Sequence, residues 1–194
     1  AICQHGGQAE ACRVDIRSRP DIGRAVELAT NRHGRIDVLC NNAAHLGRWH
    51  DVLQATEQEW RLCLETTLLG THYFTQAVLP SMIQQRRGSI LITSSIQGLV
   101  GCPNSVAYTT VKAGLIGFAR SVARDYGPYN VRVNVLCPGP IQVTGSPQPG
   151  DPDYANRVNN TFLRRVGLPD EVAQAALFLA SDEASFITGT VLPI

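Results

Sequence analysis

Lysine is almost absent from this sequence. Sixteen of its 17 basic residues are arginines, and the single lysine is Lys112. The formal net charge is only +1, and the arginines are scattered, with adjacent pairs only at 86–87 and 164–165. A chain without a basic patch or a large net charge lacks the long-range field that attracts nucleic acid or anionic lipid. We therefore expect neither nucleic acid nor a membrane as a partner.

Long apolar runs and metal-binding spacings are missing as well. No stretch approaches the ~20 apolar residues that span a bilayer, and no signal-peptide pattern occurs. The five histidines show no HExxH spacing and the six cysteines form no CxxC pair, so we expect no metal site. Cys40 and Cys137 lie in apolar runs typical of buried strands. We expect all six cysteines to be reduced, which favours a cytoplasmic protein.

The chain does contain a regular alternation of two patterns. Its 194 residues, 44% apolar and 17% charged, are typical of one globular domain with a packed core. Short runs rich in Val, Ile and Leu alternate with longer runs of helical periodicity. The expected strands are 11–15, 35–44, 89–95, 131–140 and 188–194, and the expected helices are 19–34, 56–85, 106–126 and 169–181.

This alternation predicts parallel strands joined by right-handed crossovers, which is a doubly wound α/β sheet. Ligands bind beyond the carboxyl ends of the strands in such sheets. A segment at 140–165, rich in Pro, Gly, Asn and Gln, follows one strand end and is expected to form a mobile loop with one helical piece. The residues directly after the strands therefore carry the candidate site.

Tyr108 and Lys112 stand four residues apart on a predicted helix, so they share one face. A free tyrosine has a pKa near ~10, and a nearby ammonium favours its phenolate. The pair is a plausible proton shuttle for a carbonyl or an alcohol. Lysine supplies a compact point charge there that the planar guanidinium of arginine does not match. The motif alone is weak, because an ordinary amphipathic helix can carry the same two residues.

Ser95 ends a predicted buried strand 13 residues before Tyr108. Its hydroxyl could bind a substrate oxygen, although a serine in a strand-to-loop turn is also common. A serine hydrolase would need a GxSxG elbow, and neither Ser94 nor Ser95 lies in one.

The combination of motifs is more specific than any one of them. The chain resembles classical short-chain dehydrogenases/reductases over essentially its whole length, in NNAA at 41–44, SSIQG at 94–98, YTTVK at 108–112, PGPI at 138–141 and the segment 164–192. The resemblance implies a Rossmann-like fold, and hydride transfer between NAD or NADP and a small-molecule ketone or secondary alcohol. Tyr108 would be the general acid/base, Lys112 would lower its pKa and bind the nicotinamide ribose, and Ser95 would hold the substrate oxygen.

The same resemblance implies where the cofactor would lie. Asp15 and the Ile16 backbone would contact adenine, and Asn42, Ala43 and Ala44 would pack beside the adenosine ribose. The nicotinamide would be framed by Pro138, Gly139 and the Ile141 backbone. A homo-oligomer, a tetramer or a dimer, is also implied, built on the helices at 56–85 and 106–126 and on the last helix and strand.

Three departures from the family pattern stand out. Thr67 occupies the slot of the catalytic asparagine, so its role in catalysis is doubtful. Ala44 stands where a glycine is usual, and its methyl would be strained if its φ were positive. The glycine-rich phosphate loop and the first two strands are absent, so we expect a partial nucleotide-binding domain, a fragment that alone neither folds fully nor binds dinucleotide well. The residue that selects NAD or NADP would lie in that absent part.

Two other functions remain open. Thr67 and the absent phosphate loop would also suit a catalytically impaired relative that keeps the fold as a binding or scaffolding protein. An epimerase or dehydratase of the extended branch also uses YxxxK. That branch needs a larger substrate domain, however, and only 82 residues follow Lys112.

Overall fold

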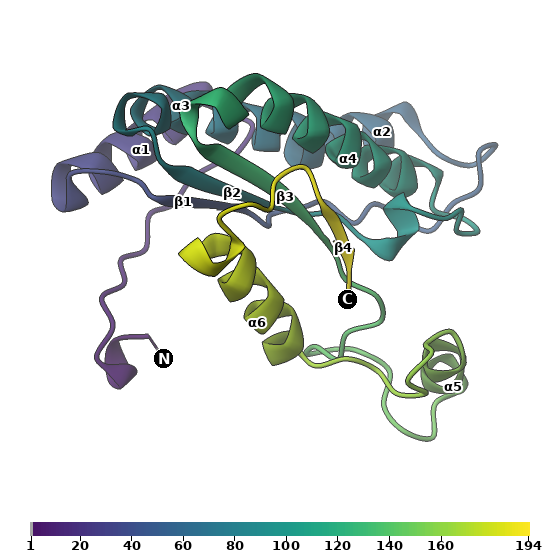
Figure 1. The fold of residues 1–194 in the computed structure, drawn as a ribbon. Helices are drawn as coiled ribbons and strands as arrows, with labels where there is room; N and C mark the ends of the chain where they lie inside the picture. The colour runs from purple at the N-terminus through teal and green to yellow at the C-terminus, as the bar shows by residue number, and fades with distance from the viewer. Residues whose placement is uncertain (1) are drawn as a thin grey trace.

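Four parallel strands form the centre of the computed structural model, which describes residues 2–194 (Figure 1). The strands are hydrogen-bonded in chain order: β1 (Val38–Asn41), β2 (Gly88–Thr93), β3 (Val131–Cys137) and β4 (Val191–Pro193). Leu39 pairs with Ile90, Ile90 with Val133, and Leu136 with Leu192. The predicted doubly wound α/β class is thus confirmed, and all four carboxyl ends lie at one edge of the sheet.

Helices cover both faces of this sheet, but unequally (Figure 1). One face carries α1 (Arg19–His33), α2 (Glu57–Cys63), α3 (Gly70–Gln85) and α4 (Val106–Tyr126), and the other carries α6 (Pro169–Ala180). The small helix α5 (Pro152–Asn159) stands away from the sheet, beyond the carboxyl end of β3. The shorter turns are η1 (Cys3–His5), η2 (Leu64–Leu69), η3 (Ile96–Gly98), η4 (Gly127–Tyr129) and η5 (Asp182–Ala184).

The two central strands are buried on both faces, as their continuous apolar runs predict. In β2, Ile90 and Ile92 pack into the core beneath α3 and α4, whereas Leu91 belongs to a second cluster with Leu136 and Leu179 under α6. The strand period of two separates these side chains between the two layers. The sheet is therefore fixed between two apolar layers, and its carboxyl ends can hold side chains in place.

Helix boundaries follow local capping chemistry. Ser18 caps α1 by accepting a hydrogen bond from Asp21 N at 3.3 Å, and Gly34 ends that helix at φ 77°. Thr56 and Glu59 form a reciprocal capping box at the start of α2. The single helix expected at 56–85 is α2 and α3 joined by η2, which is a π-helical turn. The predicted position is right, but the helix is not uniform.

Three expectations about the flanks are wrong. Residues 11–15 form no strand, because no neighbouring strand lies beside them to complete a hydrogen-bond ladder. Cys40 is exposed, because β1 is an edge strand and α6 packs on β2 and β3. The last strand is three residues long rather than seven. All six cysteines are free, and Cys137 is buried as expected.

No helix within residues 2–194 combines the length and the apolar character that a membrane crossing requires.

Candidate active site

Tyr108 and Lys112 lie on one face in the first two turns of α4. Lys112 is buried, with 3% of its surface exposed, and its Nζ donates a hydrogen bond to the Thr93 carbonyl at 2.7 Å. The same Nζ lies 5.5 Å from the centre of the half-buried Tyr108 ring. A buried ammonium is rare unless it is partnered, and here one carbonyl and one aromatic ring serve it. The predicted sharing of a face is confirmed.

The end of β2 is fastened to α4 at Lys112. Ser94 Oγ donates a hydrogen bond to the Lys112 carbonyl at 2.8 Å. Together with the bond from Lys112 Nζ to the Thr93 carbonyl, it links the strand end and the helix in both directions. Gly98 lies so close that an added Cβ would come within 2.9 Å of the Lys112 carbonyl carbon and the Ser94 hydroxyl. Strand end and helix therefore hold one fixed relative position, which in turn fixes the side chains between them.

Burial shifts the pKa values of both residues away from the charged forms. It lowers the pKa of Lys112 to about 8 and raises the pKa of Tyr108 above its ordinary 10.0. The Ser95 hydroxyl opposes the rise, because hydrogen bonding favours the phenolate. The net shift of the Tyr108 pKa is therefore upward, opposite to the expected lowering, because burial has the larger effect. At neutral pH Tyr108 keeps its proton and Lys112 remains mostly charged, so Tyr108 is ready to donate.

Ser95 lies beside Tyr108, two residues after the end of β2. It is 9% exposed, and its Oγ accepts a hydrogen bond from Gln97 N at 3.1 Å, which caps η3. Since that bond uses a lone pair, the hydroxyl hydrogen stays available to a substrate oxygen. The structure thus brings Ser95, Tyr108 and Lys112 together from two elements.

Thr67 lies inside the π-helical turn and is completely buried. Its Oγ1 accepts a hydrogen bond from His45 N at 3.1 Å, and its carbonyl accepts one from Thr71 Oγ1 at 2.8 Å. The threonine therefore ties the widened turn to the loop that follows β1. It supplies one hydroxyl where an amide would offer a donor and an acceptor on separate atoms.

The last residue of β1, Asn41, is buried and anchors the loop that follows. Asn41 Nδ2 donates to Thr75 Oγ1 at 3.2 Å, and Asn42 and Ala43 then line a small cavity of about 90 Å³ together with Ile16. Ala44 is not among the residues with positive φ, so its methyl carries no backbone strain. The substitution of glycine by alanine is therefore accommodated here.

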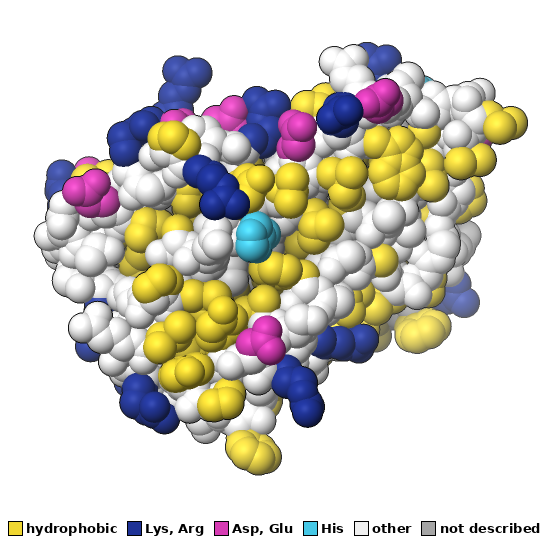
Figure 2. All heavy atoms as spheres, turned by 90° about the horizontal axis from the view of Figure 1, so that it is seen from above, with side chains coloured by type: hydrophobic (Ala, Val, Ile, Leu, Met, Phe, Trp, Pro, Cys, Tyr) yellow, Lys and Arg dark blue, Asp and Glu magenta, His cyan; other side chains and the backbone are white. Residues whose placement is uncertain are grey.

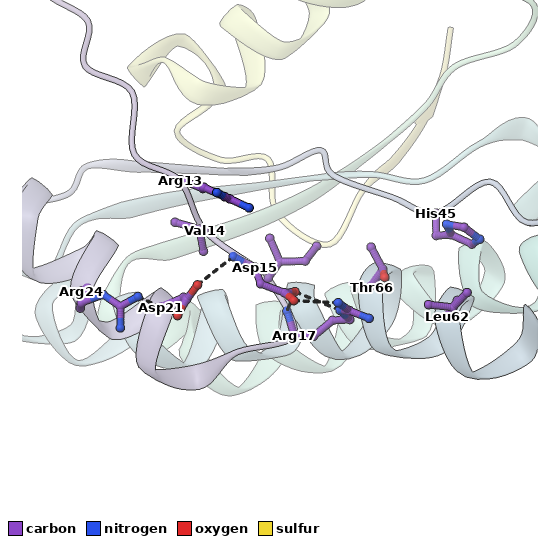
Figure 3. A pocket seen from close by; sticks show the side chains of 10 residues that line it. Arg13, Val14, Asp15, Arg17, Asp21, Arg24, His45, Leu62 and Thr66 are labelled. Atoms are coloured by element: carbon purple, nitrogen blue, oxygen red, sulfur yellow. Dashed lines mark hydrogen bonds and ion pairs between the residues drawn. The ribbon is translucent and has the colours of Figure 1, made fainter. Parts of the chain in front are cut away.

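Asp15 and Ile16 border a second, larger cavity of about 750 Å³ (Figure 3). The Asp15 carboxylate binds Arg17 through two bonds, Nε to Oδ1 at 3.0 Å and NH2 to Oδ2 at 2.7 Å, which lowers its pKa to about 2. The sequence interpretation missed Arg17, although the close spacing of opposite charges after Val14 was a usable signal. Because Ile16 lines both cavities, the two candidate adenosine contacts adjoin each other.

The segment after β3 is tied to its neighbours on both sides. The Pro138 carbonyl accepts a hydrogen bond from Ile96 N at 3.1 Å, and Gly139 N donates to the Ile194 carbonyl at 2.7 Å. Ile141 forms a parallel bridge with Gly167. The predicted nicotinamide contacts thus lie at the same sheet edge as Ser95.

The candidate cofactor-binding residues lie along this one edge of the sheet. Asp15 and Ile16 stand at one end, the loop after β1 follows, and the segment after β3 lies beyond the end of β2. Within residues 2–194, no group of three or more His, Cys, Asp or Glu side chains is placed to hold a metal ion.

Known proteins resemble this chain over nearly all of its length. The family model described as enoyl-(acyl carrier protein) reductase matches residues 1–194. The 3-oxoacyl-[acyl-carrier-protein] reductase FabG of Thermotoga maritima is 37% identical over 188 residues, which cover 97% of this chain and 76% of the relative. Oxidoreductase UcpA of Escherichia coli is 33% identical over 198 residues, covering 97% of this chain and 75% of the relative.

Solved structures agree with the fold. A crystal structure of NAD⁺-bound xylitol dehydrogenase superimposes with a TM-score of 0.91 at 30% identity, covering 98% of this chain and 80% of that one. ElxO with NADP bound superimposes with a TM-score of 0.89 at 26% identity, covering 93% of this chain and 74% of that one.

Proposed function

The chain belongs to the short-chain dehydrogenase/reductase family of NAD(P)-dependent oxidoreductases, and on that premise we propose that Tyr108 is its general acid/base. In this proposal the protein moves a hydride between the nicotinamide and a ketone or secondary alcohol. The observation that carries it is the single site formed by Tyr108, Ser95 and the buried ammonium of Lys112.

Each residue has a distinct task in this mechanism. The cofactor supplies or accepts the hydride. Tyr108 donates its proton to the carbonyl oxygen during reduction and withdraws a proton from the alcohol during oxidation. Ser95 donates a hydrogen bond to the same oxygen and stabilises the charge that develops on it. Lys112 places a positive charge against the Tyr108 ring, which stabilises the phenolate once the proton has left.

The residues that would hold the cofactor are those at the three strand-end segments. We propose that Asp15 and Ile16 contact the adenine, that Asn42, Ala43 and Ala44 lie beside its ribose, and that Lys112 binds the nicotinamide ribose. Pro138, Gly139 and the Ile141 backbone then surround the nicotinamide. The cavities at Asp15, Ile16 and Asn42 support this order along the sheet edge.

The alternative is a relative that binds cofactor but turns over poorly. Thr67 favours it, since its single hydroxyl, which already accepts a hydrogen bond from His45 N, replaces an amide that would offer a donor and an acceptor on separate atoms. The two proposals differ in one outcome. If the protein binds cofactor but shows no turnover, and Thr67→Asn does not restore turnover, the result supports the relative that only binds cofactor.

The substitution Tyr108→Phe in the full-length protein tests the main proposal. Removing one hydroxyl should lower kcat by about 10²- to 10⁴-fold, the usual contribution of a general acid/base. NADH and NADPH affinity, followed by fluorescence titration, should change little, because the ring remains. Tyr126→Phe at the far end of the same helix is the matched control. Turnover of Tyr108→Phe at the wild-type rate contradicts the assignment.

We also propose that the chain forms a homo-oligomer in a reducing, cytoplasmic setting. The outer face of the layer formed by α1 to α4 shows apolar side chains gathered between the charged ones (Figure 2). Leu177, Phe178 and Phe186, at the end of α6 and beyond it, are exposed as well. Such faces support burial against a second copy, and the six free cysteines support a reducing setting.

A further inference from the structure

A row of four buried polar residues runs along the long helix that contains the π-helical turn. Its members stand four residues apart, and none exposes more than 4% of its surface: Cys63, Thr67, Thr71 and Thr75. The first ends α2, the second lies in η2, and the last two belong to α3. Residues spaced by four lie on one side of a helix. Buried hydroxyl groups are costly unless they are hydrogen-bonded, and each member of the row has a partner.

This row meets the loop after β1 at His45. Thr67 Oγ1 accepts a hydrogen bond from His45 N at 3.1 Å, and Cys63 Sγ donates a weaker one to the His45 carbonyl at 3.8 Å. Gly47 lies against the same thiol, because a Cβ added there would come within 3.2 Å of Cys63 Sγ. Successive turns of the helix therefore bind both backbone groups of one loop residue.

The same row meets the start of the loop at Asn41. This residue ends β1, and its Nδ2 donates a hydrogen bond to Thr75 Oγ1 at 3.2 Å. Thr71, which stands between the two anchoring threonines, donates instead to the Thr67 carbonyl at 2.8 Å and so supports the turn that binds His45. Residues 42–44 lie between the two anchored positions, and they are the residues assigned above to the adenosine ribose.

Helix and loop also face each other between these anchors. The small cavity of about 90 Å³ is lined by Asn42 and Ala43 from the loop and by Gly70, Thr71 and Phe74 from α3. The helix therefore lies behind the loop from its first residue to the end of the segment that would contact the cofactor.

We propose, resting on the function proposed above, that Thr67 and Thr75 are positioning residues that hold residues 42–44 in the shape that binds the adenosine ribose. A loop that is already in its bound shape avoids the ordering cost when the cofactor arrives. When one anchor is lost, only a fraction of the molecules holds the competent loop, and the apparent Kd rises by the inverse of that fraction. In this proposal the Thr67 hydroxyl serves cofactor binding rather than proton transfer.

The substitutions Thr67→Val and Thr75→Val test this proposal in the full-length protein, because valine keeps the shape of threonine and removes the hydroxyl. Each should raise the Kd for NADH and NADPH, measured by fluorescence titration, by about tenfold, since a buried donor of the loop then lacks its partner. At saturating cofactor kcat should stay unchanged, which is the pattern of a lost binding interaction. Thr67→Ser keeps the hydroxyl and should bind like the wild type. Thr30→Val, which removes a hydroxyl bonded at 2.8 Å within α1, is the matched control.

Hydrogen exchange reports on the loop directly and requires no turnover. Without cofactor, residues 41–46 should exchange about tenfold faster in Thr67→Val and Thr75→Val than in the wild type, whereas β2 should exchange at the same rate. In the wild-type protein the His45 amide should be protected before any cofactor is added. This last measurement decides the question even if a valine variant fails to fold.

Three results overturn the proposal. The first is a His45 amide that exchanges without protection in the wild-type protein. The second is an unchanged Kd in Thr67→Val, whether or not kcat falls. The third is a loss of affinity in Thr67→Ser or Thr30→Val as large as that in Thr67→Val. Failure of the proposed function appears separately, as full activity in Tyr108→Phe, which leaves the exchange of the loop untouched.

Discussion

The proton-transfer site and the segment from 140 to 168 are held in place by different means. Around Tyr108, side chains such as Lys112 and Thr67 are buried and hydrogen-bonded to the backbone of the sheet and of the loop after β1. In the other segment Phe162 and Leu163 are exposed, and the ion pair that anchors it, Arg165 with Glu171, lies at the surface. The proton-transfer site is therefore held in place by the core, whereas the 140–168 segment depends on exposed polar contacts.

A pair of truncations should separate the two regions most strongly. Leu115 on α4 is 1% exposed within the main core, so Leu115→Ala should lower the free energy of unfolding by about 2–5 kcal/mol. Phe162→Ala removes an exposed ring and should change it by about 0.5 kcal/mol or less. Urea denaturation measures both. If Phe162→Ala lowered the free energy of unfolding as much as Leu115→Ala does, the 140–168 segment would have to pack into the core.

Lys112 is a second test of the buried site, because burying its charged ammonium lowers the stability of the folded protein. Its pKa falls from 10.5 to about 8 on folding, so between these values the unfolded chain binds more protons. Wild-type stability should therefore rise with pH across this window, by about 3 kcal/mol in total relative to Lys112→Met. The measurement is the free energy of unfolding of both proteins at pH 7 and pH 10.5.

The comparison with Lys112→Met removes the contribution of every other titrating group. A constant difference between the two proteins would show that the ammonium is not desolvated. Turnover should be lost in the variant at either pH, because Tyr108 then lacks its cationic partner.

The smallest effect is expected at the surface pair. Arg165 and the Leu168 backbone N–H hold the pKa of Glu171 down at about 2. The stabilisation that the ionised Glu171 provides is present above pH 4.5, the ordinary pKa of the carboxyl group, and is lost as the pH falls toward 2. Glu171→Gln should speed hydrogen exchange in residues 160–172 at pH 7 without changing that of β2. Equal acceleration in β2 would show that the segment and the core unfold together.

Elements with their own local signals could be predicted from the sequence. Helix α4 begins and ends where expected, and its end is explained by Gly127-Pro128, which follows its last turn. Ser95, Tyr108 and Lys112 meet as expected because parallel strands bring their carboxyl ends to one edge.

The remaining features depend on partners that a local pattern does not contain. Residues 11–15 have strand-like composition but no neighbouring strand, and Cys40 is exposed because of where α6 lies. The direction of the Tyr108 pKa shift depends on a competition between burial, which raises the pKa, and the hydrogen bond with Ser95, which lowers it. Only the three-dimensional arrangement determines which of those two effects is larger.

The π-helical turn at Leu64–Leu69 has a consequence for how the long helix meets its neighbours. Each residue of an α-helix advances the side-chain direction by roughly 100°, so the wider turn changes the phase between α2 and α3. In α2, Cys63 faces Ala107 and Val111 of α4, whereas in α3 the buried residues Val78 and Met82 face the sheet. The wider turn therefore sets the angle between the face of α2 that packs on α4 and the face of α3 that packs on the sheet. Deleting one residue within this turn would rotate α2 relative to α3 and turn one of these two packed faces toward solvent.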